Sequence, residues 1–325
     1  MKKEKIVLGI SGGVDSSVAA ILLQKDGYDV HGVFMKNWDD KHAICSAEDD
    51  YADAVSVCKK LNISLKKIDY TDEYKNKVFK QFLDDHINGF TPNPDVLCNK
   101  EIKFEDFAKY AWRLGADKIA TGHYARTIEK KGLTYLLKGI DNNKDQSYFL
   151  HAINPDILQS VIFPLGELNK EQVRNYAFKK GLPNHNKPDS TGICFIGERP
   201  FKDFIKTFLP PKPGCIVNEN GKEMGTHEGL MYFTIGQRKD LGIGGIKNLS
   251  GEPWYVAEKR QDSNELMVVQ GRDHPKLWTN TLFANSMHWL NPEMKKHLQI
   301  PIKNLLKYYF LNTEQVMCRL VNHED

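Results

Sequence analysis

The chain has 325 residues, of which 41% are hydrophobic and 27% charged, and its formal net charge is +3. These values are ordinary for a globular protein of two or three domains, and they permit a polyanionic partner without requiring one. No apolar run approaches the roughly 18–20 residues of a membrane span, and the apolar stretch near the N-terminus is too short for a signal peptide. We therefore expect a cytoplasmic protein with no membrane partner.

Strand and helix patterns alternate along the first 120 residues, where apolar runs separated by helical periodicity predict strands at residues 5–10, 29–35, 63–68 and 118–121. Helices are expected within residues 18–22, 47–58, 74–90 and 101–114. Alternation of this kind predicts an α/β fold in which helices cover both faces of a parallel sheet.

The pattern changes after residue 126. Polar residues 130–132 between two β-like runs predict a hairpin, and Asn169 with Gln172 predicts a capped helix that stops at residues 181–183. Further short strands are expected at residues 215–217, 229–235, 254–257 and 266–269. With the proline-rich boundary at residues 209–214, these patterns predict a catalytic domain (1–209), a small β-rich domain (210–271) and a C-terminal β module (272–325).

A glycine- and serine-rich loop, Ser11–Ser17, lies between the first strand and the first helix. The unpaired N–H groups at a helix N-terminus suit phosphate, and Gly12 and Gly13 let a ligand approach the backbone. Asp15 would repel a bare phosphate, so it indicates a magnesium ion or a structural bond within the loop. The loop lacks both the Walker A and the dinucleotide-binding patterns. It resembles instead the pyrophosphatase loop of the N-type ATP pyrophosphatases, which cleave ATP to AMP and pyrophosphate.

Two of the six cysteines occur in a setting that favours reactivity. Cys98 follows a proline-stiffened loop at or near a predicted helix N-terminus, with Lys100 and Lys103 close by, and Cys194 lies in a glycine-flanked loop with basic neighbours. Both settings favour the thiolate. Of the other cysteines, three are expected to be packed side chains (Cys58, Cys215, Cys318), and Cys45 lies in a polar loop. The sequence contains no Cys-x-x-Cys pair, which argues against a zinc ribbon.

Seven motifs occur in one order and together resemble the bacterial tRNA-specific 2-thiouridylases. They are residues 11–17, 35–38, 91–104, 120–124, 144–150, 189–198 and 236–239. The resemblance extends from the first strand to about residue 271. It implies an adenine nucleotide alpha hydrolase-like domain, a small β-rich domain and a C-terminal β-barrel.

The resemblance also implies a reaction, the 2-thiolation of the wobble uridine of lysine, glutamate and glutamine tRNAs by a sulfurtransferase. ATP, with Mg²⁺ expected, adenylates the uracil C2 oxygen. Cys194 carries a persulfide supplied by a sulfur-relay carrier protein or a cysteine desulfurase, and Cys98 assists by forming a disulfide with Cys194. No metal site built from protein side chains is implied.

Binding roles follow residue by residue from the same resemblance. ATP is expected at Gly9, Ile10, Ser11, Gly12, Gly13, Val14, Asp15, Ser16, Met35 and Gly122. The target base is expected at Asn93, Pro94 and Asp95, and tRNA contacts at His123, Lys144, Asp145 and Gln146. Considered alone, His123 also fits a strand-end histidine bonded to backbone, and residues 144–146 also fit a solvated turn.

The chain departs from the family pattern after His288–Trp289. Lys307–Tyr308 lies where an Arg-Tyr pair is expected, but its flanks match poorly, so we expect a shortened or diverged, incomplete barrel. Two other functions stay open at this point. One is another tRNA-modifying or amidating ATP pyrophosphatase, which would need neither Cys98 nor Cys194, and the other is a tRNA-binding remnant.

Overall fold

A computed structural model describes residues 3–39, 46–189, 200–243, 251–279, 288–291, 303–306 and 316–319. The chain forms two compact units. The first comprises residues 1–80, 93–198 and 288–292, and the second comprises residues 81–92, 199–287 and 293–325. Each unit is described by itself.

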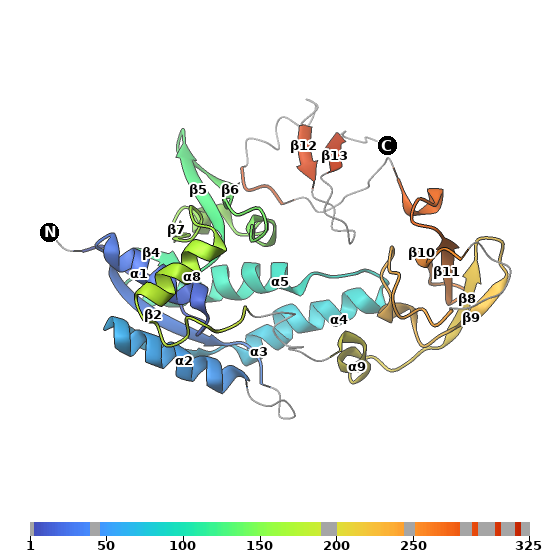
Figure 1. The fold of residues 1–325 in the computed structure, drawn as a ribbon, viewed down its shortest axis with the longest axis horizontal. Coiled ribbons are helices and arrows are strands. Elements are labelled where there is room, and N and C mark those ends of the chain that lie inside the picture. Colours follow the sequence, from blue (N-terminus) through green and yellow to red (C-terminus); the bar gives the residue numbers. More distant parts are fainter. Residues whose placement is uncertain are drawn as a thin grey trace. The chain divides into compact units, whose positions relative to one another are not determined.

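The first unit is built on a parallel sheet in which the described strands follow the order β3-β2-β1-β4-β7 (Figure 1). Central strand β1 carries Ile6, Val7 and Leu8, all fully buried, as expected for a strand covered on both faces. The parallel sheet predicted from the sequence is confirmed. Its strands are β1 (Lys5–Gly9), β2 (Asp29–Lys36), β3 (Ser64–Asp69), β4 (Lys118–Ala120) and β7 (Val161–Ile162).

Helices cover both faces of this sheet, because successive side chains of a strand point to opposite sides. Ile6 and Leu8 belong to a buried cluster that also includes residues of α1, α2 and α8. A side chain at Gly9, on the other face, would lie within 3.9 Å of Phe107 in α6. The described helices of this unit are α1 (Val14–Lys25), α2 (Ser46–Leu61), α3 (Thr71–Tyr74), η1 (Lys75–Phe79), α5 (Pro94–Leu97), η2 (Cys98–Asp106), α6 (Phe107–Arg113), η3 (Ser147–Phe149), α7 (Pro155–Leu158) and α8 (Lys170–Lys179).

Two local predictions in this unit are confirmed. Strands β5 (Ala125–Lys130) and β6 (Leu133–Lys138) pair as a hairpin whose turn residues both have positive φ, 54° at Lys131 and 73° at Gly132. That geometry suits the right-handed twist of the strands. Helix α8 begins with the expected capping box between Asn169 and Gln172.

The second unit contains a sheet with the order β10-β11-β8-β9 and a separate antiparallel pair, β12 with β13. One strand prediction here is wrong, since residues 229–235 contain a 3₁₀ turn rather than a strand. The amides of Tyr232 and Phe233 bond back to Gly229 and Leu230, which turns Leu230 and Tyr232 into the core. The elements of this unit are α4 (Lys80–Ile87), most of which belongs here, α9 (Phe201–Lys206), β8 (Gly214–Asn218), β9 (Glu223–His227), η4 (Leu230–Tyr232), β10 (Trp254–Arg260), β11 (Glu265–Gln270), η5 (Pro275–Leu277), β12 (Lys303–Leu306) and β13 (Val316–Arg319).

The burial expected for the spare cysteines is only partly confirmed. Cys58 is buried in α2, and desolvation raises the pKa of its thiol to about 11, as expected for an inert packed cysteine. Cys215 lies in β8 but is exposed, so the expectation that it packs in a core is wrong.

Strand β10 carries a buried amine. The Nζ atom of Lys259 is inaccessible to solvent and has no hydrogen-bond partner among the described residues, and burial lowers its pKa to about 8. A lysine whose folded-state pKa lies below its unfolded value destabilises the fold below pH 8, and stability rises with pH from about 8 to 10.5.

Lys259→Met is therefore expected to stabilise the second unit at pH 7 by about 2 kcal/mol, given roughly 1.4 kcal/mol per pKa unit less a discount for partial exposure. Thermal unfolding followed by circular dichroism at pH 7 and pH 10 measures the effect. The gain over the parent protein should shrink at the higher pH. An equal or lower melting temperature at pH 7 would contradict the burial argument.

Candidate functional site

The loop Ser11–Ser17 lies at the carboxyl end of β1 and leads into α1, at the edge where parallel sheets bind ligands. Gly13 is the N-cap of α1 and its position carries no side-chain cap, so backbone N–H groups remain available for an anion. Gly12 has a φ of +80°, and a Cβ atom there would lie 2.1 Å from the carbonyl oxygen of Asp50 in α2. Only glycine fits this position.

The positions predicted to bind ATP lie close together. A Cβ atom on Gly122 would lie 2.9 Å from the backbone nitrogen of Ser16, and one on Gly9 would lie 3.1 Å from Cε of Met35. Gly122 therefore borders the loop, and Met35 borders the end of β1 just before it, although both are distant from the loop in sequence. This proximity is what the resemblance requires, and ATP binding at these residues stays a prediction.

The sequence does not single out Asn184, yet this side chain holds the loop in place through hydrogen bonds. Its Nδ2 atom donates to the carbonyl oxygen of Gly12 at 2.8 Å and to Oγ of Ser17 at 2.9 Å. The side chain is 4% exposed. A buried amide with two such bonds fixes the position of a glycine-rich backbone that is otherwise free to move.

Asn184→Ala is expected to loosen this loop and to raise the KM for ATP about tenfold, the loss that corresponds to one hydrogen bond of about 1.4 kcal/mol. Steady-state release of AMP as a function of ATP concentration measures it. Asn154→Ala, which removes the side-chain cap of α7 and no bond to the loop, is the matched comparison. A KM unchanged in Asn184→Ala would show that the loop does not depend on this amide.

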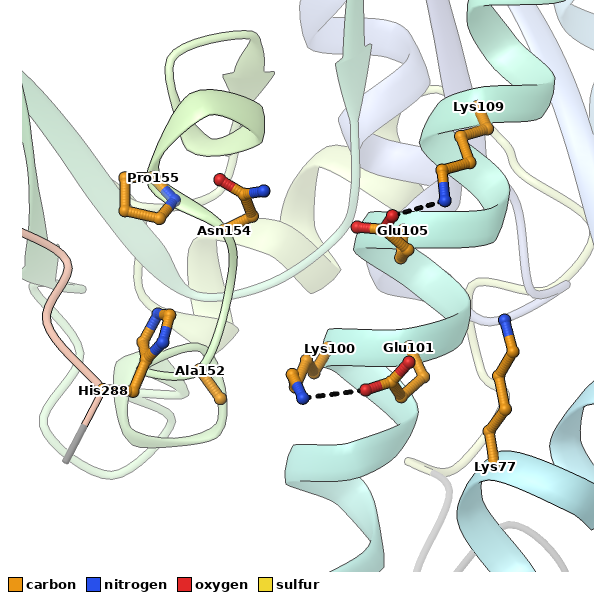
Figure 2. A pocket seen from close by; sticks show the side chains of 9 residues that line it. All are labelled: Lys77, Lys100, Glu101, Glu105, Lys109, Ala152, Asn154, Pro155 and His288. Carbon is orange, nitrogen blue, oxygen red and sulfur yellow. Dashed lines mark ion pairs between the residues drawn. The ribbon is translucent and has the colours of Figure 1, made fainter. Parts of the chain in front are cut away.

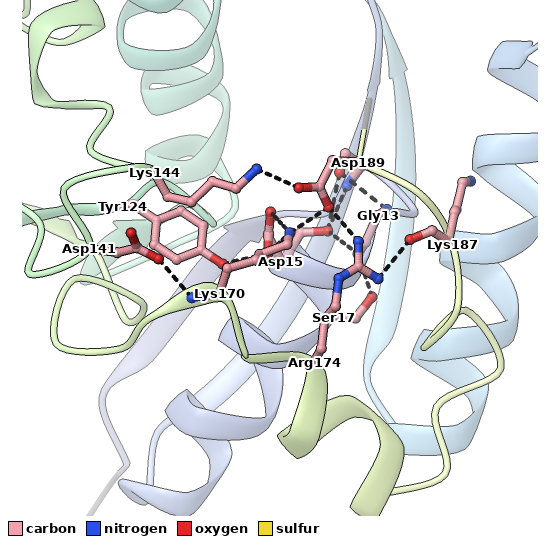
Figure 3. A network of polar contacts seen from close by, with 12 residues as sticks. Gly13, Asp15, Ser17, Tyr124, Asp141, Lys144, Lys170, Arg174, Lys187 and Asp189 are labelled. Carbon is pink, nitrogen blue, oxygen red and sulfur yellow. Dashed lines mark hydrogen bonds and ion pairs between the residues drawn. The ribbon is translucent and has the colours of Figure 1, made fainter. Parts of the chain in front are cut away.

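A charged network surrounds the loop's only carboxylate (Figure 3). Asp15 accepts from the hydroxyl of Tyr124 at 2.8 Å and from Nζ of Lys170 at 2.8 and 2.9 Å. The structural bond expected of Asp15 is thus made to residues outside the loop. Burial and the neighbouring Asp15 both raise the pKa of Tyr124, so its hydroxyl remains a donor.

Asp189 is the second carboxylate of the network. Its Oδ1 atom accepts from Lys170 at 2.7 Å and from Arg174 at 2.7 Å, and its Oδ2 atom accepts from Lys144 at 2.6 Å. Desolvation alone would raise the pKa of Asp189, but the hydrogen bonds from Lys144 and Lys170 outweigh it and hold the pKa at about 2. Asp189 is therefore an anion throughout the physiological range.

The helix that carries Cys98 begins earlier than predicted. Asn93 is its N-cap and accepts from the amide of Asp95 at 3.1 Å, with the buried Pro94 as the first helical residue. Cys98 therefore lies in the second turn, near the helix N-terminus but not at it, and the predicted helix start at about residues 99–101 is corrected. The thiol is 1% exposed. Asp95 and Cys98, three positions apart, share one face of this helix, and burial raises the pKa of Asp95.

The residues predicted to contact tRNA occupy different settings. Nδ1 of His123 lies 2.8 Å from Oγ1 of Thr121, and burial lowers the pKa of His123 well below its usual value, so the ring is neutral. Asp145 is buried and accepts from Gly139 and Ser147, and Oε1 of Gln146 accepts from the amide of Tyr124. Of residues 144–146, Lys144 alone has a side chain directed at another charged group, Asp189.

Comparison with known proteins places this chain in a family. The family described as "tRNA methyl transferase HUP domain" matches residues 4–198, and "tRNA methyl transferase PRC-barrel domain" matches residues 202–270. A tRNA-specific 2-thiouridylase MnmA of Pseudomonas fluorescens (strain SBW25) is 54% identical over 293 residues, which cover 90% of this chain and 78% of that protein. One of Stutzerimonas stutzeri is 50% identical over 326 residues, covering 100% and 86%.

The chain belongs to the tRNA-specific 2-thiouridylase family. This membership confirms the resemblance drawn from the seven motifs, together with the parallel-sheet catalytic domain and the small β-rich domain that follows it. The roles of individual residues and the division at residues 209 and 271 remain predictions.

Several predicted positions of this thiouridylase family member lie outside the described residues. They are Cys45, Cys194 with the rest of its loop, and Lys307–Tyr308. The structure therefore places Cys98 but does not place its expected partner. Asp189 is the last described residue before the Cys194 loop.

A pocket of about 510 Å³ lies beside η2 in the first unit (Figure 2). Three lysines line it, and each is paired with a carboxylate: Lys77 with Asp106, Lys100 with Glu101 and Lys109 with Glu105. This compensation leaves little net charge to attract an anion. Within the described part of the chain, no three His, Cys, Asp or Glu side chains form a metal-binding group, and no helix has the length and apolar character to cross a membrane.

Proposed function

We propose that this chain is a tRNA-uridine 2-sulfurtransferase that uses ATP to replace O2 of the wobble uridine by sulfur in lysine, glutamate and glutamine tRNAs. The observation that carries the proposal is the close packing of the loop, in a chain that belongs to the thiouridylase family. Gly12 packs against the backbone of α2, and Gly122 packs against the backbone of Ser16. The anion-binding end of α1 supports a nucleotide phosphate at this point.

Magnesium fits this site only as an ion that enters with ATP. Mg²⁺ in nucleotide enzymes usually has one or two carboxylate ligands and takes the remaining oxygens from phosphates and water. Asp15 offers one carboxylate at the loop, and its present partners Lys170 and Tyr124 keep it oriented. Mg²⁺ would there screen the charge of the phosphates.

The proposed chemistry has two stages. The uracil O2 attacks the α-phosphorus of ATP and pyrophosphate leaves, which makes O2 a good leaving group. The thiolate of Cys98 then attacks Sγ of the Cys194 persulfide, forming a Cys98–Cys194 disulfide and releasing sulfide. Sulfide attacks C2, the C2–O bond breaks and AMP leaves. The sulfane sulfur is reduced as the two cysteines are oxidised, and a thiol reductant restores them.

The start of helix α5 supports the proposed placement of the base. The cap formed by Asn93 and the fixed φ of Pro94 hold this turn rigid, and Asp95 faces the same side as Cys98. A wobble base lies in a single-stranded loop, so turning it outward costs less than extruding a base from a duplex. Asn93, Pro94 and Asp95 are accordingly proposed to hold the base.

Mass spectrometry of tRNA nucleosides tests the function. Unmodified lysine tRNA is incubated with the full chain, ATP, Mg²⁺ and a sulfide source, and the expected product is 2-thiouridine with equal amounts of AMP and pyrophosphate. A tRNA with cytidine at the wobble position serves as the matched substrate and should give none. Absence of 2-thiouridine while a related thiouridylase is active in parallel would overturn the proposal.

Two further parts of the proposal concern the sulfur supply and the location. A sulfur-relay carrier protein or a cysteine desulfurase is proposed to load Cys194, and the cytoplasmic location stays a prediction. The first is tested by replacing the sulfide source with cysteine, a desulfurase and candidate carriers. Sulfur transfer that depends on a carrier would support this part.

A further inference from the structure

Asp189 lies where three parts of the first unit meet. Lys170, at the start of α8, also binds Asp15 of the nucleotide loop. Lys144 comes from the turn proposed to contact tRNA, and Arg174 lies one turn along α8 from Lys170. Figure 3 shows these three cationic side chains directed at the two carboxylates.

Three cationic side chains of this network are bonded to two carboxylates. Lys144, Lys170 and Arg174 share Asp15 and Asp189, and Lys170 is bonded to both, whereas the neighbouring Asp141 accepts from the backbone amide of Lys170. Its side chain is only 14% exposed, so these ion pairs are weakly screened by solvent. When one cation leaves a shared carboxylate, the carboxylate attracts the remaining cations more strongly.

We propose that Asp189 is a positioning residue that couples the nucleotide site to the tRNA site, by dividing its charge between Lys170 on one side and Lys144 on the other. The proposal rests on the proposed function in taking ATP to bind at the loop and tRNA to bind near Lys144. Asp189 itself touches neither substrate and acts through the two lysines.

The direction of the coupling follows from the charge sharing. ATP phosphates at the loop draw Lys170 toward themselves, so Asp189 holds Lys144 more tightly and a tRNA phosphate competes for Lys144 less well. A tRNA phosphate that takes Lys144 leaves Lys170 more tightly held by Asp189. The contribution of Asp189 is therefore antagonistic, and linkage makes it equal in both directions.

The test compares tRNA binding with and without α,β-methylene-ATP, an analogue that cannot be split into AMP and pyrophosphate. Filter binding gives the dissociation constant of the tRNA in each condition, and the ratio of the two values, with analogue over without, measures the coupling. Asp189→Asn is expected to lower this ratio by about fivefold or more. Titrating the analogue with and without tRNA must give the same change.

Matched variants separate charge sharing from general damage. Asp189→Glu retains the carboxylate and is expected to keep the ratio. Lys187→Met breaks contacts of the same segment to Asp50 and Asp53 without touching Asp189, and its ratio should stay within about twofold of the parent. If Asp189→Asn does not fold, Lys144→Met breaks the link at its tRNA end and must lower the ratio equally.

A ratio in Asp189→Asn equal to that of the parent protein would overturn the inference while leaving the proposed function intact. A parent protein that binds neither tRNA nor the analogue would instead contradict the proposed function. In the double variant Asp189→Asn/Lys144→Met, the ratio should fall no further than in either single variant, since both break one connection. An additive fall would also overturn the inference.

Discussion

Serine in place of Cys98 or Cys194 is expected to lower the formation of 2-thiouridine by three orders of magnitude or more, roughly the loss seen when an essential nucleophile is removed. Serine oxygen cannot carry a persulfide, and it cannot form the disulfide that releases sulfide. ATP binding at the loop depends on neither thiol, so the exchange of labelled pyrophosphate into ATP should persist in both variants. The two measurements are made on the same preparations with unmodified tRNA, and sulfur is supplied by cysteine and a cysteine desulfurase, because free sulfide would attack C2 without either thiol.

Cys215→Ser is the matched control, because Cys215 is an exposed thiol on β8 of the second unit. It should leave both measurements at the parent level. Normal 2-thiouridine formation in either Cys98→Ser or Cys194→Ser would contradict the sulfur-transfer role of the replaced cysteine. Loss of pyrophosphate exchange together with thiolation would show that the thiols also support the loop.

The second large effect is expected at Gly12. An alanine there must adopt a φ of +80° and must place Cβ 2.1 Å from the carbonyl oxygen of Asp50, so the loop or α2 has to shift. A displacement of about 1 Å in a positioning element typically costs about a hundredfold in rate. Gly12→Ala should therefore lower kcat/KM for ATP about a hundredfold, and 2-thiouridine formation should fall with it.

Gly27→Ala provides the comparison for backbone strain. Gly27 has a φ of +89° but no atom within 4 Å of an added Cβ, and it lies beyond the far end of α1. Gly27→Ala should lower the free energy of unfolding by about 1 kcal/mol and leave kcat/KM for ATP unchanged. If Gly12→Ala and Gly27→Ala have the same kcat/KM for ATP, the close approach of the loop to α2 does not contribute to activity.

The sequence predicts the structure correctly where interactions between neighbouring residues determine it. The apolar run of β1, the glycines of the loop and the capping box of α8 each act over a few residues, and each was found as predicted. The sequence does not predict the helix start at Asn93, although Asn-Pro is a recognisable cap, because a proline-rich stretch also fits a loop. That error moved Cys98 by one helical turn.

The polar surroundings of the loop could not be predicted in this way. Asn184 contacts Gly12 across 172 residues of sequence, and Lys170 contacts Asp15 across 155. A single asparagine or lysine has no pattern of its own, and only the packing of α8 against α1 makes these contacts possible. The strand predicted at residues 229–235 is wrong for a different reason. Alternating apolar residues usually indicate a strand, but here a 3₁₀ turn buries the alternate side chains Leu230 and Tyr232.

The wide π-helical turns of η2, which start at Cys98, have an evolutionary consequence. A π turn holds one more residue than the α turn it replaces, so it commonly marks an inserted residue. Because the extra residue is accommodated within one wide turn, the segments on either side of it keep their faces, so an inserted residue between Asp95 and the packed face of α6 does not turn Asp95 away from that face. The same widening changes which side chains within η2 share a face with Cys98, so an insertion can alter the surroundings of the thiol while the helix stays continuous.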